Sequence, residues 1–259
     1  MSRFRVIRFD EVDSTNAVCR QLALEGAPEG AVVHAMRQTS GRGRQGRTWH
    51  STGDFGLWFS ILLRPGQLNP GIDAPMGGMV SIAAGVGVCG ALERFGIAVG
   101  LKWPNDVLIS GRKVCGILAE SALDDSRLDW VVLGIGINVN TPDGGFPPEL
   151  RSIATAVDQH LPKQDVPEKG ELLAAVLDCV FDEYRMLAQG KAESVRESAE
   201  VRMGSMLGAR ITCSTSSGPV TGVAEGLRPT GALILRAYDG REFTVTAGDV
   251  TIGSGKVFG

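Results

Sequence analysis

Hydrophobic and polar residues alternate in several segments of the first 140 residues, and this pattern predicts strands. Residues 4–9 alternate apolar and basic side chains, which is typical of a half-buried strand. Short apolar or alternating runs predict further strands at residues 31–36, 57–63, 98–103, 106–109, 113–121 and 130–139. A Gly-containing link at 109–113 separates two of these runs, so the sequence predicts a hairpin there.

Three segments have the pattern of helices instead. Residues 15–25 carry an apolar stripe at helical spacing, with Asp13 or Ser14 as the predicted N-cap. Residues 76–95 form a long run of small apolar residues and predict a buried central helix. Residues 172–187 predict an amphipathic helix. Because strands outnumber helices and do not alternate regularly with them, we expect an α+β fold: a mixed, largely antiparallel sheet with helices on one face.

The chain changes character after residue 190. Residues 191–200 are rich in charge, and short strand-like runs separated by Gly, Pro and Ser then follow at 209–213, 220–225, 232–236 and 243–246. Four or five strands in some fifty residues indicate a small barrel. The predicted domain boundary lies near residue 200, with one domain at 1–200 and a second at 205–259.

Composition and charge narrow the class of protein. With 43% hydrophobic and 21% charged residues among 259, the chain has the composition of a globular protein, and we expect no stretch to reach the length of a transmembrane helix. The net charge of −3 argues against general nucleic-acid binding. The five cysteines have no metal-binding spacing, and the N-terminus has no signal-peptide pattern, so we expect a cytoplasmic protein.

The glycine-rich segment at residues 41–47, GRGRQGR, is the first candidate for chemistry. It contains the spacing G-x-G-x-x-G, but no apolar helix follows it as in dinucleotide-binding folds, and it lacks the Gly-Lys-Ser/Thr of a phosphate-binding P-loop. Three arginines on a glycine-rich backbone, with no acidic residue between Gly30 and Gly53, predict a local cradle for carboxylate or phosphate. Taken alone, the segment could equally be a solvated, disordered basic loop.

Two further segments combine polar groups with glycine. Residues 101–107, LKWPNDV, precede Lys113, and Gly116 in the following strand marks a place where a ligand or another backbone approaches. Residues 134–140, GIGINVN, place glycines in an apolar strand that ends in Asn. By themselves, these features are equally consistent with an ordinary turn and two surface lysines.

Together the motifs carry a family resemblance that covers essentially the whole chain. The segments DSTN at 13–16, GRGRQGR at 41–47, KWPND at 102–106, GIL at 116–118 and GIGIN at 134–138 occur in the order found in biotin-protein ligases of the biotin–acetyl-CoA-carboxylase ligase type. The resemblance implies a class II synthetase-like catalytic domain followed by a small SH3-like β-barrel.

The resemblance also implies an activity. The chain is expected to activate biotin with ATP and Mg²⁺ to biotinyl-5′-AMP, releasing pyrophosphate, and to transfer biotin to a lysine of a biotin carboxyl carrier protein. Joining a carboxylate to a phosphate brings two anions together, which explains Arg and Lys in place of a protein nucleophile. No dedicated protein metal site is expected, because Mg²⁺ accompanies the phosphates of ATP.

Site residues follow from the same resemblance, position by position. The biotin-binding set is Ser14, Thr15, Asn16, Gln38, Gly41, Arg42, Gly43, Arg44, Lys113 and Gly116. The set expected to bind ATP or the adenylate is Arg44, Arg47, Trp49, Lys102, Asn105, Lys113 and Asn138. Among these, Lys113, Arg42 and Arg44 are the expected catalytic residues, and Asp106 is a candidate proton acceptor in the transfer step.

The sequence leaves several alternatives open. A lipoate ligase or octanoyl transferase of the same fold would use a nucleophilic cysteine, for which Cys115 near Lys113 is the one candidate. A non-catalytic phosphate-binding module is a second alternative. Many bacterial relatives carry an N-terminal DNA-binding domain, and the motifs here begin at Asp13, so we expect a ligase without DNA binding. The oligomeric state stays undetermined, with a homodimer as a candidate.

Overall fold

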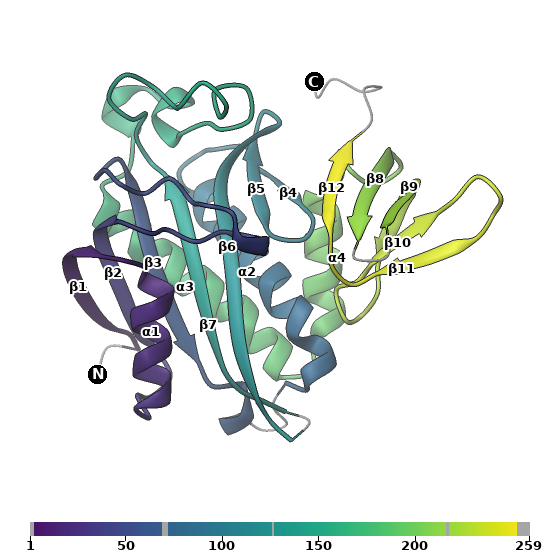
Figure 1. The fold of residues 1–259 in the computed structure, drawn as a ribbon, viewed down its shortest axis with the longest axis horizontal. Coiled ribbons are helices and arrows are strands. Elements are labelled where there is room, and N and C mark those ends of the chain that lie inside the picture. Colours follow the sequence, from purple (N-terminus) through teal and green to yellow (C-terminus); the bar gives the residue numbers. More distant parts are fainter. Residues whose placement is uncertain (1–2, 69–71, 126, 216–217, 253–259) are drawn as a thin grey trace.

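A large mixed sheet and a small antiparallel sheet organise the computed structural model, which describes residues 3–68, 72–125, 127–215 and 218–252 (Figure 1). The large sheet has the strand order β1-β2-β3-β7-β6-β5-β4. Its strands are β1 (Arg5–Val12), β2 (Ala31–Gln38), β3 (Gly56–Leu63), β4 (Gly100–Lys102), β5 (Asp106–Ile109), β6 (Arg112–Asp124) and β7 (Arg127–Asn138). Only the pair β1–β2 is parallel within this sheet; every other neighbouring pair is antiparallel.

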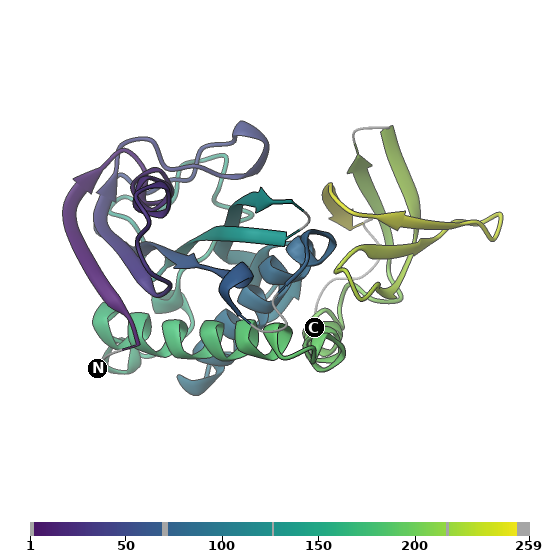
Figure 2. The same cartoon turned by 90° about the horizontal axis from the view of Figure 1, so that it is seen from below.

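The helices cover both faces of the large sheet, unequally. Three of them, α2 (Gly77–Arg94), α3 (Lys169–Ala188) and α4 (Ala192–Arg202), lie on one side, and the shorter α1 (Thr15–Leu24) packs on β2, β3 and β7 from the other side (Figures 1 and 2). Short 3-10 turns occur at Arg44–Gly46, Pro65–Gln67, Ala74–Met76, Val157–Gln159 and Lys163–Asp165.

The alternation of side chains along each strand divides the core into two parts. On β2, Val32 belongs to the large cluster beneath α2 and α3, whereas Val33 belongs to the smaller cluster with Cys19 and Ala23 of α1. This is the period-two pattern of a strand that is buried on both faces. The larger cluster fixes the sheet, and the smaller one holds α1 so that its first residues lie over the middle strands.

The small sheet packs beside the large one and has the order β11-β10-β9-β8-β12. Its strands are β8 (Arg210–Thr215), β9 (Gly218–Leu227), β10 (Leu233–Arg236), β11 (Glu242–Val245) and β12 (Asp249–Ile252). The indole N–H of Trp103 donates to the carbonyl of Gly231 at 2.9 Å, and Glu200 of α4 accepts from the backbone N–H of Leu227 at 2.8 Å. Both contacts tie the C-terminal sheet to the part of the chain that contains the large sheet.

The predicted α+β class is confirmed, and each predicted strand and helix occurs within a few residues of its expected position. Helix α4 was missed, because its sequence, AESVRESAEVR, has few apolar residues and buries only Val195 and Ala199. Helices α2, α3 and α4 lie on one face of the large sheet, as expected, whereas the predicted helix α1 lies on the opposite face. The division into domains at 1–200 and 205–259 remains our proposal.

One expectation about segment length was wrong. Within the described residues, the helical segment Ala74–Arg94 is long and apolar enough to cross a membrane by composition. However, 67% of its most apolar window is buried inside the fold, against α3 and the sheet. It is the central core helix that the sequence pattern predicts.

Glycine substitutions along α2 should separate close packing from helix propensity. A Cβ on Gly87 would lie 2.5 Å from Cα of Val180 on α3, so Gly87→Ala forces the two helices apart. We expect a loss of roughly 1–3 kcal/mol in the free energy of unfolding, measured by denaturant titration. Gly90 on the same helix has open space around its Cβ position. Gly90→Ala should therefore stabilise by about 0.5–1 kcal/mol, and equal effects of the two substitutions would contradict the packing argument.

Candidate functional site

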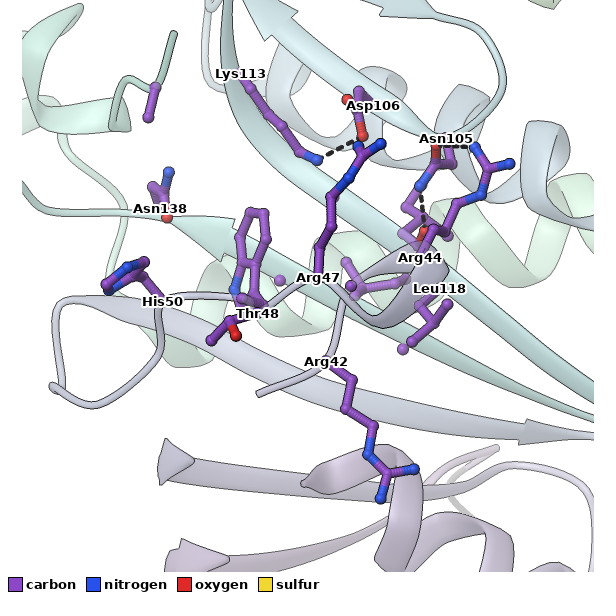
Figure 3. A pocket seen from close by; sticks show the side chains of 18 of the residues that line it. Arg42, Arg44, Arg47, Thr48, His50, Asn105, Asp106, Lys113, Leu118 and Asn138 are labelled. Atoms are coloured by element: carbon purple, nitrogen blue, oxygen red, sulfur yellow. Dashed lines mark hydrogen bonds and ion pairs between the residues drawn. The ribbon is translucent and has the colours of Figure 1, made fainter. Parts of the chain in front are cut away.

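A cavity of about 440 Å³ lies over the middle strands of the large sheet. Its walls come from the start of α1, the segment 42–50, strands β5 to β7, the segment 146–154 and Asp249 of the small sheet. Figure 3 shows many of these side chains from close by. The cavity therefore lies where the large sheet, the small sheet and the glycine-rich segment meet.

The start of α1 forms a polar end of the cavity. Oε1 of Gln38, on β2, accepts hydrogen bonds from the backbone N–H of Thr15 at 2.8 Å and from its hydroxyl at 3.1 Å. Gln38 therefore caps the helix from a neighbouring strand. Ser14 occupies the predicted N-cap position, but its hydroxyl makes no capping bond. Since Ser14 is 2% exposed and lines the cavity, its hydroxyl is placed to meet a ligand.

Asn16 fits directly onto the sheet because Gly134 has no side chain. A Cβ at Gly134 would lie 2.0 Å from Oδ1 of Asn16. The amide Nδ2 of Asn16 donates to Glu120 at 2.7 Å, and Oδ1 lies 2.6 Å from the hydroxyl oxygen of Ser60. Asn16 is thus held from strands on both sides of β7.

Trp49 rests on a second glycine surface. Gly116 of β6 and Gly136 of β7 are register partners, and a Cβ on either would lie within 3.0 Å of the Trp49 ring. The ring lies 5.2 Å from Nζ of Lys113, as a cation–π contact. Because one face of the indole packs on the sheet, only its remaining surface is available to a ligand.

The glycine-rich segment is folded as a small hairpin rather than lacking structure. Arg42 and Thr48 form an isolated antiparallel bridge, and Gln45 at the tip adopts a left-handed conformation with φ of 55°. Arg44 donates to Oδ1 of Asn105 at 3.1 Å and to the carbonyl of Gly248 at 3.3 Å. The segment is therefore held on one side by Asn105, next to the large sheet, and on the other by Gly248, next to the small sheet.

The other two arginines of the segment differ in their partners. Arg47 forms an ion pair with Asp249 on β12. The Arg42 side chain is exposed and points away from the Lys113–Asp106 pair (Figure 3). In the part of the chain that the structure describes, Arg42 has no hydrogen-bond or ion-pair partner, so its guanidinium is available to an anion.

Lys113 is fixed through its backbone and paired through its side chain. Its N–H donates to Ile153 and its carbonyl accepts from Thr155, at 2.8 and 2.9 Å, so the segment 153–155 runs beside it like an extra strand. Its ammonium lies 2.7 Å from a carboxylate oxygen of Asp106. The two side chains are 31% and 22% exposed, and they are therefore partly screened by solvent.

The two asparagines of the predicted nucleotide set serve the framework in this structure. Nδ2 of Asn105 donates to the carbonyl of Ile117 at 2.6 Å, while its Oδ1 accepts from Arg44. Asn138 is 5% exposed and donates to the carbonyl of Thr155 at 3.0 Å. Lys102, the last residue of β4, also lines the cavity.

The charge of the cavity is opposite to that of the whole chain. Five cationic side chains line it, against two carboxylates: Arg42, Arg44, Arg47, Lys102 and Lys113 face Asp106 and Asp249. The chain as a whole has a net charge of −3. The cavity is therefore suited to a ligand with several negative charges.

The arrangement offers little to a metal ion and nothing to a thiol mechanism. Among the described residues, no group of three or more His, Cys, Asp or Glu side chains could hold a metal ion, and both carboxylates of the cavity are paired with cations. Cys115 is completely buried, and burial raises the pKa of its thiol well above its ordinary value. A buried, protonated thiol is a poor nucleophile.

Every residue of the predicted site set except Gly41 lines this one cavity. Gly41 lies behind it, where a Cβ would lie 2.3 Å from the hydroxyl of Ser51. Two groups of residues at the site were not predicted from the sequence: the apolar side chains of the cavity wall, and polar residues that bond to the predicted ones. The apolar wall includes Phe59, Leu118, Ile135, Phe146 and Leu150. The supporting polar residues are Ser51, Ser60, Glu120 and Asp249.

Comparisons with known proteins agree on one family. The profile of the biotin/lipoate A/B protein ligase family matches residues 8–138. The chain is 35% identical over 254 residues to the bifunctional ligase/repressor BirA of Bacillus subtilis (strain 168), covering 96% of this chain and 74% of that protein. It is 34% identical to the biotin–[acetyl-CoA-carboxylase] ligase of Mycobacterium tuberculosis (strain H37Rv), covering 93% of this chain and 86% of that protein.

A solved structure extends the similarity to the fold. The biotin protein ligase from Aquifex aeolicus in complex with biotin and ATP superposes with a TM-score of 0.78 at 30% sequence identity. The match covers 96% of this chain and 98% of the other, so it includes both the large sheet and the C-terminal sheet.

The glycine surface under Trp49 can be tested by adding one methyl group. In Gly136→Ala the new Cβ would lie 2.5 Å from Nε1 of Trp49, so the indole and the segment 41–50 must lift from the sheet. We expect trypsin to cut the segment at least about threefold faster, because its open form becomes more populated. Gly170→Ala, at an exposed glycine with open space, is the control. Unchanged cleavage in Gly136→Ala would contradict the packing that we describe.

Proposed function

The chain belongs to the biotin/lipoate A/B protein ligase family, and from this premise we propose that it activates biotin with ATP and transfers it to a lysine of a carrier protein. It is a biotin–protein ligase that uses ATP. The observation that carries the mechanism is the cavity itself, which combines a neutral polar end at α1 with a cationic end at Lys113.

The neutral end suits the cyclic urea of biotin. A urea group has one carbonyl acceptor and two N–H donors, and it must be hydrogen-bonded when it is buried. Ser14, Thr15 and Gln38 supply hydroxyl and amide groups there, at 6% exposure or less. The apolar wall next to them, with Leu118 and Phe59, suits the thioether ring and the alkyl chain.

The cationic end suits the first chemical step. The biotin carboxylate attacks the α-phosphorus of ATP, the bond to the departing pyrophosphate breaks, and biotinyl-5′-AMP forms. Lys113 and Arg44 would reduce the repulsion between the reacting anions, as fixed cations do in other phosphoryl and nucleotidyl transfers, and Arg42 would join them once its free side chain turns toward the ligand. Mg²⁺ would be held mainly by the phosphates of ATP, since the protein offers few free carboxylates here.

The second step needs a proton acceptor. The carrier amine attacks the carbonyl carbon of the mixed anhydride, the bond to AMP breaks, and the amine loses a proton as the amide forms. Asp106 lies 2.7 Å from Lys113 at this end of the cavity, and we propose it as the acceptor. The carrier is a biotin carboxyl carrier domain on this proposal. The five cysteines are free thiols, which supports a reducing, cytoplasmic location.

The competing transferase activity has less support. It would require a reactive thiol, and Cys115 is buried in β6 with its pKa raised by burial. The discriminating experiment is pyrophosphate release with ATP and one carboxylic acid at a time. Release that depends on biotin supports the proposal, whereas release with lipoate or octanoate and not with biotin would overturn it.

Lys113→Gln tests the cationic end. The change removes one positive charge without adding bulk, and it leaves the backbone bonds to the segment 153–155 in place. We expect adenylate formation to slow by more than about a hundredfold, or roughly 3 kcal/mol, because the fixed charge acts in the transition state. Lys163→Gln, at an exposed lysine outside the cavity, should have no effect. Near-normal pyrophosphate release in Lys113→Gln would remove Lys113 from the mechanism.

Asp249→Asn tests the contact between the small sheet and the glycine-rich segment. The substitution breaks the ion pair with Arg47, which is an exposed pair worth at most about 1 kcal/mol. The segment should then open more often and release biotinyl-5′-AMP up to about fivefold faster. Without a carrier, steady-state pyrophosphate release should therefore rise, while the single-turnover rate stays within about twofold.

A matched control lies on the same sheet. Glu242→Gln breaks ion pairs with Arg228 and Arg236 outside the cavity, and it should leave adenylate release unchanged. If Asp249→Asn also leaves release unchanged, the contact with Arg47 has no part in holding the intermediate.

A further inference from the structure

Two polar side chains support the neutral end of the cavity without lining it. Ser60, on β3, is completely buried. Glu120 lies on β6, two strands away in the sheet order. Neither belongs to the cavity wall, yet both contact Asn16, which does. Any effect of Ser60 and Glu120 on a ligand in the cavity must therefore pass through Asn16 or another wall residue.

The orientation of the Asn16 amide follows from its neighbours. Nδ2 lies 2.7 Å from a carboxylate oxygen of Glu120 and 3.3 Å from the carbonyl of Leu118, and both of these groups only accept hydrogen bonds. Oδ1 lies 2.6 Å from the hydroxyl oxygen of Ser60. The amide is therefore oriented with its donor side toward Glu120 and its acceptor side toward Ser60.

This orientation decides where the hydroxyl protons lie. Oδ1 of Asn16 cannot donate, so Ser60 must donate its single proton to it. Oε1 of Gln38 accepts from the hydroxyl of Thr15 at 3.1 Å and from its backbone N–H at 2.8 Å. The hydroxyl oxygen of Thr15 lies 2.8 Å from that of Ser60, whose proton points mainly to Asn16, so lone-pair capacity on the Thr15 oxygen is left for a ligand.

The outward polarity of the wall matches a cyclic urea. The hydroxyl oxygen of Thr15 presents its free acceptors to the urea N–H groups, and the Ser14 hydroxyl, which has no capping bond, can donate to the urea carbonyl. A dithiolane or an alkyl chain has no N–H group and would leave these acceptors unpaired, which costs binding energy in a buried site.

We infer that Glu120 and Ser60 are positioning residues that fix the hydrogen-bond polarity of this wall, and that they thereby select a cyclic urea over acids that lack N–H groups. Glu120 sets the order together with the more distant carbonyl of Leu118, because both groups can only accept, and so the chain Glu120–Asn16–Ser60 has one direction that turns the Ser60 proton toward Asn16 and away from Thr15. The inference rests on the proposed function, since it assumes that biotin occupies this end.

The test compares Glu120→Gln, Ser60→Ala and the double variant in the full chain. A glutamine keeps the size of the side chain but can also donate, so only the longer contact with the Leu118 carbonyl, at 3.3 Å, still holds the Asn16 amide. The amide then turns over more easily, and the chain loses its single direction. Each single variant should raise the KM for biotin by about tenfold, with kcat within about threefold and the KM for ATP unchanged. Desthiobiotin, which keeps the cyclic urea, should show the same rise.

The preference for biotin over octanoate, as a ratio of kcat/KM, should fall by a similar factor in each variant. Because both substitutions interrupt one chain, the double variant should be little worse than either single variant. Ser121→Ala, which removes an exposed hydroxyl from the next position on β6, is the control and should behave as the parent does.

The outcomes separate the inference from the proposed function. A parent protein without biotin-dependent pyrophosphate release contradicts the function. If the parent is active but Glu120→Gln keeps its biotin KM and its preference, the inference is overturned. Additive losses, or parallel losses toward ATP, would indicate a structural role only and overturn it too. If Ser60→Ala unfolds, the isosteric Glu120→Gln still decides the question.

Discussion

The site depends on the absence of side chains at three positions of the large sheet. Gly116, Gly134 and Gly136 lie on the paired strands β6 and β7, and at each of them a Cβ would collide with a residue from outside the sheet. Asn16 occupies the space above Gly134, and Trp49 occupies the space above the other two. Side chains at these glycines would push Asn16 and Trp49 away from the strands, and with them the start of α1 and the glycine-rich segment that line the cavity.

The two ends of the cavity would bind a ligand through different interactions, namely directed hydrogen bonds at one end and charge at the other. At the α1 end, buried neutral groups bond to one another, so their effect depends on geometry and on the direction of each hydrogen bond. At the Lys113 end, the charged groups are partly exposed, and their effect depends on the number of cations near the ligand. A ligand that is neutral and polar at one end and anionic at the other uses both, and a biotin molecule joined to a nucleotide has this distribution.

The sequence predicts those features that depend on local pattern. The strands other than β12, the three apolar helices and the glycine-rich segment follow from periodicity and composition. Gly116 was predicted as a point where a ligand or another backbone approaches, and the structure places the Trp49 ring there. Helix α4 was not predicted, because two buried residues in a charged segment give too weak a pattern. The contacts of Ser60 and Asp249 could not be predicted, because each depends on a residue 44 or more positions away.

The position of Glu120 beside the site, by contrast, could have been predicted from the alternation of side chains along β6. Gly116, Leu118 and Glu120 are two residues apart on β6 and therefore share a face, so a carboxylate was to be expected beside the site. No comparable pattern surrounds Asp249, since nothing in the sequence there indicates that β12 lies against the glycine-rich segment.

The partners of the arginines explain how such a segment can be ordered and still be ready for a ligand. Arg44 is held by an amide oxygen and a backbone carbonyl, and Arg47 is held by one exposed carboxylate. These are modest interactions, worth about 1 kcal/mol or less each in water. A phosphate gives a guanidinium a stronger, charge-assisted partner. On the proposed function, Arg44 and Arg47 are thus held by bonds weak enough to be exchanged for those of a nucleotide phosphate, so that little of the binding energy is lost in ordering the segment.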